Sequence, residues 1–246
     1  MIPIRDNNPT RTRPVVTWLI IAANVAVYLY QFTLDPESER QFVERFGVIP
    51  ALLVYERYLG SWITPLSSMF LHGGFVHLAF NMWSLFIFGD NVEDVLGKRR
   101  FIAFYLLSGL GAAAGQVLVD PSSTVPMVGA SGAIAGVLAA YMRLFPQARV
   151  LTVIPLLFFF FTQEIPAVLF ILLWFAMQVL SGVGMLSMAG EQGGGVAFFA
   201  HIGGFLVGLF TIRSLLPVRN PTRGWAPPAE RRSRAARVVD TNVPRV

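Results

Sequence analysis

Apolar residues occur along this chain in long runs that short polar segments separate. A helix needs about 20 mostly apolar residues to cross a bilayer, and six segments of the chain approach that length. The candidates are residues 15–32, 75–88 (extendable to 89), 101–119, 129–145, 165–180 and 200–216. The second and fourth are short and polar for spans that face lipid, so we expect them inside a bundle. The pattern therefore predicts an all-α, polytopic membrane protein with six transmembrane helices.

The connection between the first two spans, residues 34–71, is much longer than the roughly 2–8 residues that usually join helices in a bundle. It contains the amphipathic stretch FVERFGVIPALLVYERYL, residues 42–59. Charged positions among apolar ones are typical of a helix in the membrane interface, a depth that also suits Trp62. We therefore expect an interfacial helix in this first loop.

Composition supports a membrane protein and limits its chemistry. Hydrophobic residues make up 54% of the chain and charged residues 13%, about half of the roughly 25% that is usual in soluble domains. The absence of cysteine excludes disulfides, thiolate nucleophiles and cysteine-based metal sites. The last thirty residues hold seven arginines among prolines and alanines, which predicts a disordered tail rather than a nucleic-acid-binding surface.

Charge also predicts the orientation of the chain. If both termini are cytoplasmic, the inner segments hold sixteen Lys and Arg residues and the outer segments only three. The positive-inside rule therefore predicts cytoplasmic termini. The expected organisation is a cytoplasmic segment (1–14), a six-span domain (15–216) and a basic cytoplasmic tail near anionic lipid (217–246). Short loops and absent cysteines favour a bacterial inner membrane, and no cleavable signal peptide is expected.

Polar side chains gather at the starts of three spans. The second span opens with His72, His77 and Asn81, the fourth with Ser131, and the sixth with His201. Because these spans run in the same direction, their first turns lie at similar depth near the outer surface, and His77 and Asn81 share one helix face. Intramembrane polar residues are energetically expensive and usually functional. We therefore predict that these residues form one site.

This set of residues fits a serine hydrolase. A serine hydroxyl is a weak nucleophile that needs a base within hydrogen-bond reach, and His201 could serve Ser131 in that role. Ser131 begins a helix, whose unpaired N–H groups and dipole favour the negative charge of an acyl-transfer intermediate. Asn81 and His77 could add side-chain donors. No acid lies near His201 apart from Glu191 in a loop, so we expect a Ser–His dyad.

Glycines would allow the helices that carry this dyad to meet. Gly132 and Gly136 in the fourth span form a GxxxG pattern, as do Gly204 and Gly208 in the sixth. Membrane helices with this spacing approach each other closely, which would bring the serine to the histidine. Gly129, just before the fourth span, would let the backbone approach a substrate.

Simpler interpretations exist for each residue. A serine between glycine and alanine in a membrane helix usually serves packing, and a lone histidine there is often a structural hydrogen-bonding group. His72 fits such a role in the loop before its span, and Glu93 is expected to pair with the basic run 98–100. Three histidines without a neighbouring acid or an HExxH spacing give little support for a metal site. A transporter with a histidine proton relay is disfavoured, because no polar groups continue to the inner side.

Three motifs resemble those of the rhomboid family of intramembrane serine proteases. GASG (129–132) is similar to the family's GxSG nucleophile motif, HGGFVHLAFN (72–81) to its HxxxxHxxxN motif, and AHIGGFLVG (200–208) to its AHxxGxxxG motif. The resemblance covers about residues 15–216 and implies the rhomboid bundle of six transmembrane helices.

The resemblance also implies a role for each residue. Ser131 would be the nucleophile and His201 the base. The oxyanion hole would be formed by Asn81, His77 and the backbone N–H groups of Ser131 and Ala130. Packing and near-site positions would be His72, Gly129, Gly132, Gly204 and Gly208. The chain departs from the family at Ala135, where many members carry an aromatic residue that stacks on the base.

The implied activity is cleavage of single-span membrane proteins near the outer end of their transmembrane helix, without a cofactor, a metal or a nucleic-acid partner. Substrate would enter sideways from the lipid bilayer between the second and fifth spans. The loop MAGEQGGGVAFF (188–199), with glycines at 193–195, suits a mobile cap. The alternative is an inactive rhomboid-like protein that binds membrane clients, but such relatives usually lack the serine or the histidine.

Overall fold

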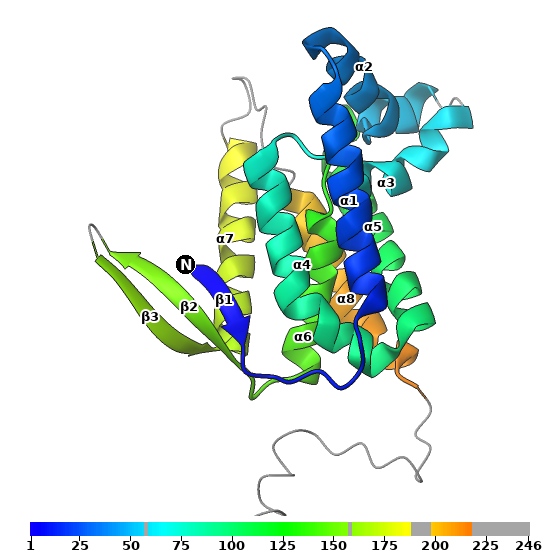
Figure 1. Ribbon diagram of the computed structural model, residues 1–246. Helices are drawn as coiled ribbons and strands as arrows, with labels where there is room; N and C mark the ends of the chain where they lie inside the picture. The colour runs from blue at the N-terminus through cyan, green and yellow to red at the C-terminus, as the bar shows by residue number, and fades with distance from the viewer. Residues whose placement is uncertain (57–58, 157–158, 188–197, 218–246) are drawn as a thin grey trace, which may run out of the picture. The chain divides into compact units, whose positions relative to one another are not determined.

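Helices dominate the computed structural model, which describes residues 1–56, 59–156, 159–187 and 198–217. The residues from Met1 to Leu216 form one compact unit. Its helices in chain order are α1 (Val15–Thr33), α2 (Pro36–Phe46), α3 (Thr64–Ser67), α4 (Phe75–Leu96), α5 (Lys98–Val119), α6 (Ser131–Leu144), α7 (Ala167–Ser187) and α8 (Phe198–Leu215) (Figure 1). Helices α1 and α4–α8 coincide with the six predicted apolar segments, which confirms a polytopic helical bundle. The expected disordered tail and the glycines of the expected cap lie outside the described residues.

Several of these helices are able to cross a bilayer. By length and hydropathy, α1, α5 and α8 qualify as spans within the described part of the chain. The segment Gly60–Phe70 and α4 meet at 78° and could together form a fourth, bent span. Helix α6 and the first part of α7 are apolar but shorter. The protein is therefore an integral membrane protein, while the number of six spans stays a prediction.

Helix α6 is the central helix of the bundle. All its residues from Gly132 to Tyr141 are buried, as predicted for the fourth span. A Cβ atom on Gly204 or Gly208 of α8 would run into the backbone of Gly132 or Gly136 of α6. Two backbones can approach this closely only where hydrogen replaces a side chain, so the predicted GxxxG packing is confirmed.

A second glycine contact joins α5 to α8. Gly111 and Gly115 of α5 face Gly203 of α8, where a Cβ atom on Gly203 would meet the α5 backbone. Because Gly203 precedes Gly204, α8 presents small residues to α5 and α6 at the same level. The start of α8, which carries His201, is thereby packed against two helices.

Helix α4 corrects the prediction that the second span is an inner helix. It runs for 22 residues, and Phe75, Phe80 and Phe86 on one side are more than half exposed, at 70%, 54% and 54%. The opposite side buries Asn81 and Leu85. The helix therefore lies at the edge of the bundle, with one apolar face turned outward and one face against α6.

Glu93, near the end of α4, caps the start of α1. Its carboxylate accepts hydrogen bonds from the backbone N–H of Val16 (3.0 Å) and Thr17 (2.7 Å) and from the Thr17 hydroxyl (2.8 Å). The expected pairing of Glu93 with the basic run 98–100 is wrong, because the carboxylate instead satisfies N–H groups that a helix start leaves without partners. A negative charge is also favoured at this end of the helix dipole.

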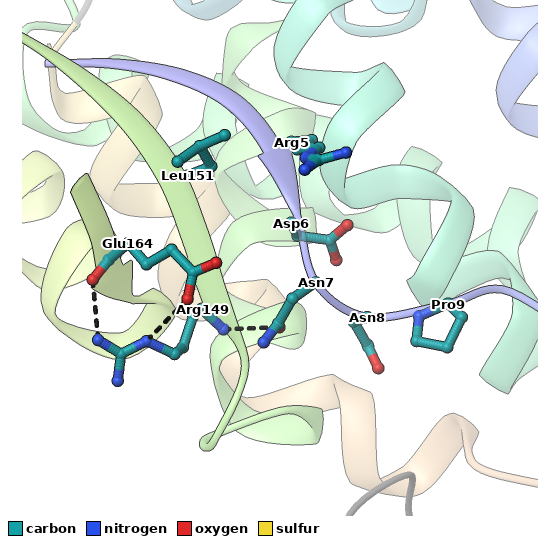
Figure 2. Close-up of a pocket in the computed structure, with 8 residues that line it drawn as sticks. All are labelled: Arg5, Asp6, Asn7, Asn8, Pro9, Arg149, Leu151 and Glu164. Atoms are coloured by element: carbon teal, nitrogen blue, oxygen red, sulfur yellow. Dashed lines mark hydrogen bonds and ion pairs between the residues drawn. The ribbon is translucent and has the colours of Figure 1, made fainter. Parts of the chain in front are cut away.

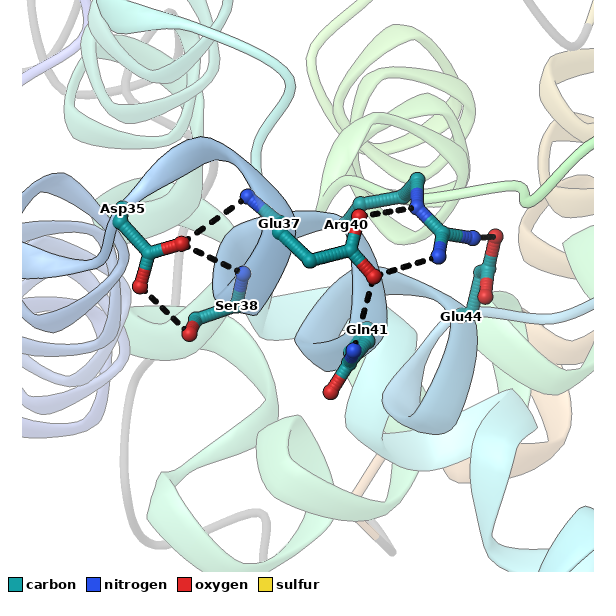
Figure 3. A network of polar contacts seen from close by, with 6 residues as sticks. All are labelled: Asp35, Glu37, Ser38, Arg40, Gln41 and Glu44. Atoms are coloured by element: carbon teal, nitrogen blue, oxygen red, sulfur yellow. Dashed lines mark hydrogen bonds and ion pairs between the residues drawn. The ribbon is translucent and has the colours of Figure 1, made fainter.

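The first loop is helical, but a single interfacial helix over 42–59 is wrong. Asp35 caps the start of helix α2, because its carboxylate accepts from the N–H groups of Glu37 and Ser38 (Figure 3). Arg40 pairs with Glu37 and Glu44 along the exposed side of this helix. The helix ends at Phe46, Gly47 after it is extended, and Val48 then pairs with Met127. Short helical turns follow at Leu52–Glu56, Leu59–Ile63 and Ser68–Phe70, with α3 between the last two.

A three-stranded antiparallel sheet accompanies the helices. Its order is β1 (Ile2–Asp6), β2 (Arg149–Leu156) and β3 (Phe159–Pro166), so the N-terminal segment pairs with the hairpin that precedes α7. Figure 1 shows the sheet beside α7 and α4. This sheet was not predicted, because a short continuous apolar run fits a strand as well as a buried helix. The fifth helix accordingly begins only at Ala167, directly after Pro166.

Candidate active site

Ser131 and His201 lie within hydrogen-bond distance of each other. The Ser131 hydroxyl oxygen is 2.7 Å from Nε2 of His201. Ser131 is the first residue of α6, and His201 lies in the first turn of α8. The glycine contacts between the two helices bring their starts together, as the sequence predicts. His201 is 7% exposed, whereas Ser131 is half-buried, so the base is the more shielded member of the pair.

The pair borders a cavity of about 610 Å³. Helix α4 contributes His77, Phe80 and Asn81 to its wall, and α7 contributes Phe170 and Trp174. The cavity therefore lies between α4 and α7, with the serine–histidine pair on the wall formed by α6 and α8. Its volume lies within the range of ~300–1,000 Å³ that is usual for ligand pockets.

The start of α6 offers backbone donors beside the serine. The first hydrogen bond of the helix runs from the Ile134 N–H to the Ala130 carbonyl at 3.0 Å. The N–H groups of the residues before Ile134 therefore have no acceptor within the helix. Gly129, just before it, has φ +121° and donates its N–H to the Ser68 carbonyl at 2.9 Å. This left-handed conformation favours glycine and turns the chain sharply into α6.

His77 and Asn81 lie against this turn. A Cβ atom on Gly129 would be 2.8 Å from the His77 ring and 3.6 Å from the Asn81 amide nitrogen. Any larger residue at 129 would therefore displace the His77 ring and would touch the Asn81 amide, the two side chains that the sequence assigns to an oxyanion hole. Both of them line the cavity together with Gly129 and Ser131, whereas Ala130 is buried behind that wall.

His72 is fully buried and contacts Asn81. Its Nε2 is 2.9 Å from the Asn81 amide nitrogen, which orients that side chain toward the site. The backbone of His72 is fixed by Gln31 of α1, which accepts from its N–H at 3.1 Å and donates to its carbonyl at 3.2 Å. The structural role expected for His72 thus includes both holding the loop and orienting a site residue.

Two side chains of α7 that were not predicted as site residues contact the histidine. Gln178 Oε1 is 2.7 Å from Nδ1 of His201, and the Trp174 ring centroid lies 5.7 Å from that of the imidazole. Ala135 is buried in α6 and offers no ring at the position that departs from the family. A signal was present: Gln178 is the single polar side chain in residues 167–180 other than the Trp174 indole, four positions earlier.

The N-terminal strand also reaches the cavity. Met1 and Pro3 of the β1 region line it, and the Trp83 indole N–H of α4 donates to the Pro3 carbonyl at 2.6 Å. At the other end of the strand, the Asp6 carboxylate accepts a hydrogen bond from the Tyr141 hydroxyl of α6. The segment predicted as a cytoplasmic extension is therefore part of the wall of the site.

A separate polar hollow of about 330 Å³ lies between the N-terminal segment and the hairpin (Figure 2). Arg149 donates to the Glu164 carbonyl at 2.9 Å, and its backbone N–H donates to the Asn7 side chain at 2.9 Å. These contacts join β1 to β2 and β3. None of the residues that line this hollow is a serine or histidine, and no group of three metal-ligating side chains occurs in the described part of the chain.

The fold and the site together define an integral membrane protein with a serine–histidine pair at the starts of two packed helices. The family model of the rhomboid domain matches residues 59–218. The chain belongs to the rhomboid family.

Its similar relatives include named proteases. The chain is 34% identical over 141 residues to the rhomboid protease AarA of Providencia stuartii, covering 51% of this chain and 49% of that protein. It is 31% identical over 130 residues to the rhomboid protease GluP of Bacillus subtilis, covering 53% and 24%. RHOMBOID-like protein 2 of Arabidopsis thaliana is 33% identical over 220 residues, covering 87% and 62%. The chain thus spans about half or less of the length of the two bacterial relatives.

Proposed function

We propose that this protein is an intramembrane serine endopeptidase that cleaves single-span membrane proteins near the outer end of their transmembrane helix. The observation that carries the proposal is the 2.7 Å contact between the Ser131 hydroxyl and His201 Nε2 on the wall of a cavity. Membership of a family whose relatives include named proteases supports it. The class of substrate and the catalytic roles of Ser131 and His201 are part of this proposal.

The reaction follows from the positions of the two side chains. The Ser131 hydroxyl oxygen attacks the carbonyl carbon of the scissile peptide bond while His201 Nε2 takes the hydroxyl proton. The carbonyl oxygen gains a negative charge, which the N–H groups of Ser131 and Ala130 and the side chains of Asn81 and His77 stabilise. His201 then donates the proton to the leaving amine. A water molecule, deprotonated by His201, hydrolyses the acyl-enzyme and restores the serine.

Access to the site follows from the two helices that flank the cavity. Helices α4 and α7 form opposite walls, and each presents apolar side chains on its outer surface. A transmembrane substrate would approach from the bilayer between them and unwind locally to expose its peptide bond. We extend the proposal to cytoplasmic termini and a bacterial inner membrane, both of which rest on the distribution of charge and loop length in the sequence.

A fluorophosphonate probe tests for an activated serine. The protein in membranes should be labelled at Ser131, because only a serine with an adjacent base reacts at an appreciable rate. Ser131→Ala and His201→Ala should both abolish labelling, while Ser68→Ala, a buried serine beside the site, should keep it. Absence of labelling in the parent protein, with the fold intact, would favour the inactive client-binding protein.

A further inference from the structure

Gln178 extends the serine–histidine pair by one residue. The Ser131 hydroxyl contacts His201 Nε2, and His201 Nδ1 contacts Gln178 Oε1, each at 2.7 Å. We propose that Gln178 is a positioning residue that holds His201 in the tautomer and orientation needed to accept the serine proton. This inference rests on the proposed function, because it assigns the group that keeps the base of that reaction ready.

The chemistry of the two partners sets the tautomer. An amide carbonyl oxygen only accepts hydrogen bonds, so the contact with Gln178 Oε1 requires the proton to reside on Nδ1. Neutral imidazole then has an unprotonated Nε2, which is the nitrogen that faces Ser131. The opposite amide orientation would place the imidazole proton on Nε2, where it would block proton transfer from the serine. Only the observed arrangement is compatible with catalysis by this pair.

Gln178 holds the tautomer and orientation of His201 without carrying a charge. No aspartate or glutamate contacts His201 among the residues that the structure describes. In a Ser–His–Asp triad, an amide in place of the orienting carboxylate gives the wrong tautomer when its NH₂ group faces the imidazole, and kcat falls about 10⁴-fold. In this protein the amide oxygen of Gln178 faces Nδ1 instead. A neutral amide supplies the tautomer and the orientation but no charge to stabilise the imidazolium. Its removal should therefore cost less, about 10–100-fold in kcat.

Helix α7 also restrains the ring through a second side chain. Trp174 lies one helical turn before Gln178, on the same face of α7, with its ring plane at 46° to the imidazole. Ala135 of α6, the position where many family members carry a stacking ring, has no ring, and the contacts of the imidazole with an aromatic ring and an amide both come from α7. Because both contacts belong to one helix, a displacement of α7 would remove them together and release His201 from its orientation.

Two substitutions at one position separate positioning from packing. Gln178→Met keeps the length of the side chain but removes the acceptor, and it should lower kcat about 10–100-fold with KM within about twofold. Gln178→Glu keeps an acceptor oxygen and should retain most of the activity. Met177→Ala, at a neighbouring residue that is 62% exposed, is the matched control and should change neither constant. Equal kcat in the parent and Gln178→Met, or a Gln178→Glu variant as impaired as Gln178→Met, would overturn the proposal.

A spectroscopic measurement keeps this test independent of proteolysis. The chain has three histidines, so ¹⁵N-histidine labelling gives a simple NMR spectrum in which the His201 signals are assigned by their loss in His201→Ala. We expect the parent protein to show a protonated Nδ1 and an unprotonated Nε2 at His201, and Gln178→Met to show a mixture of tautomers. A parent His201 with the proton on Nε2 would contradict the inference even if the protein proves to be inactive. If His201 shows the expected tautomer but the protein is inactive, the proposed function is wrong and the assignment of Gln178 as the positioning residue stands.

Discussion

Replacing Glu93 by glutamine should destabilise the protein by about 2–5 kcal/mol. The carboxylate is 2% exposed and accepts three hydrogen bonds from the start of α1. Glutamine has one acceptor oxygen, so its NH₂ group must face a backbone N–H of Val16 or Thr17, which then lacks a partner at about 1–3 kcal/mol. The remaining bonds lose their charge and about half of their strength. The lost interaction with the helix dipole adds about 0.3–1 kcal/mol.

Asp94 provides a matched control for this experiment. Its carboxylate accepts from the backbone N–H of Thr12 (2.9 Å) and from the Thr12 hydroxyl (2.6 Å), but these contacts are exposed to solvent. Asp94→Asn should therefore change stability by less than about 1 kcal/mol, because water replaces the lost contacts. Unfolding of the parent and both variants is followed by tryptophan fluorescence during SDS titration in one detergent. A Glu93→Gln variant as stable as Asp94→Asn would refute the capping argument.

Three further predictions concern the site and its supports. Asn81→Ala should lower kcat about 10–1000-fold by loss of an oxyanion donor, and unchanged kcat in a cleavage assay would remove Asn81 from the oxyanion hole. Gly208→Val should destabilise the bundle by about 1–3 kcal/mol, because it overpacks the contact between α8 and α6, and it should slow fluorophosphonate labelling; a variant with the parent's stability and labelling rate would contradict that contact. Burial raises the pKa of Asp6 from 3.8 to about 6, so the folded state binds this proton more tightly than the unfolded chain. The resulting stabilisation is present below about pH 4 and is lost as the pH rises through about 6; unfolding measured against pH should show a larger loss in the parent protein than in Asp6→Asn.

The parts of the site that could be predicted from the sequence are those fixed by helix direction and spacing. Ser131 and His201 each begin a helix, the two helices run in the same direction, and GxxxG patterns allow them to touch. These conditions leave little freedom in where the two side chains lie. The boundaries of α1, α6 and α8 were predicted to within about two residues, because each helix coincides with a run of apolar and small residues that polar segments bound.

The remaining features depend on contacts between segments far apart in the sequence. The pairing of β1 with β2 joins residues about 150 positions apart, and nothing local in either strand specifies the other. Glu93 was assigned to nearby cations because their positions are visible in the sequence, whereas its actual partners lie 76–77 residues away in α1. Gln178 was overlooked in the same way, since only the packing of α7 against α8 reveals that it faces His201.

Cleavage of a tagged single-span substrate in membranes tests the central claim most directly. The parent protein, Ser131→Ala and His201→Ala are compared at equal expression across several substrates. The account predicts that the parent cuts near the outer end of the substrate helix and that both variants leave it intact. Cutting that persists in either variant would contradict the dyad. Substrate that binds the parent protein but is never cut would contradict the protease and support a client-binding rhomboid protein.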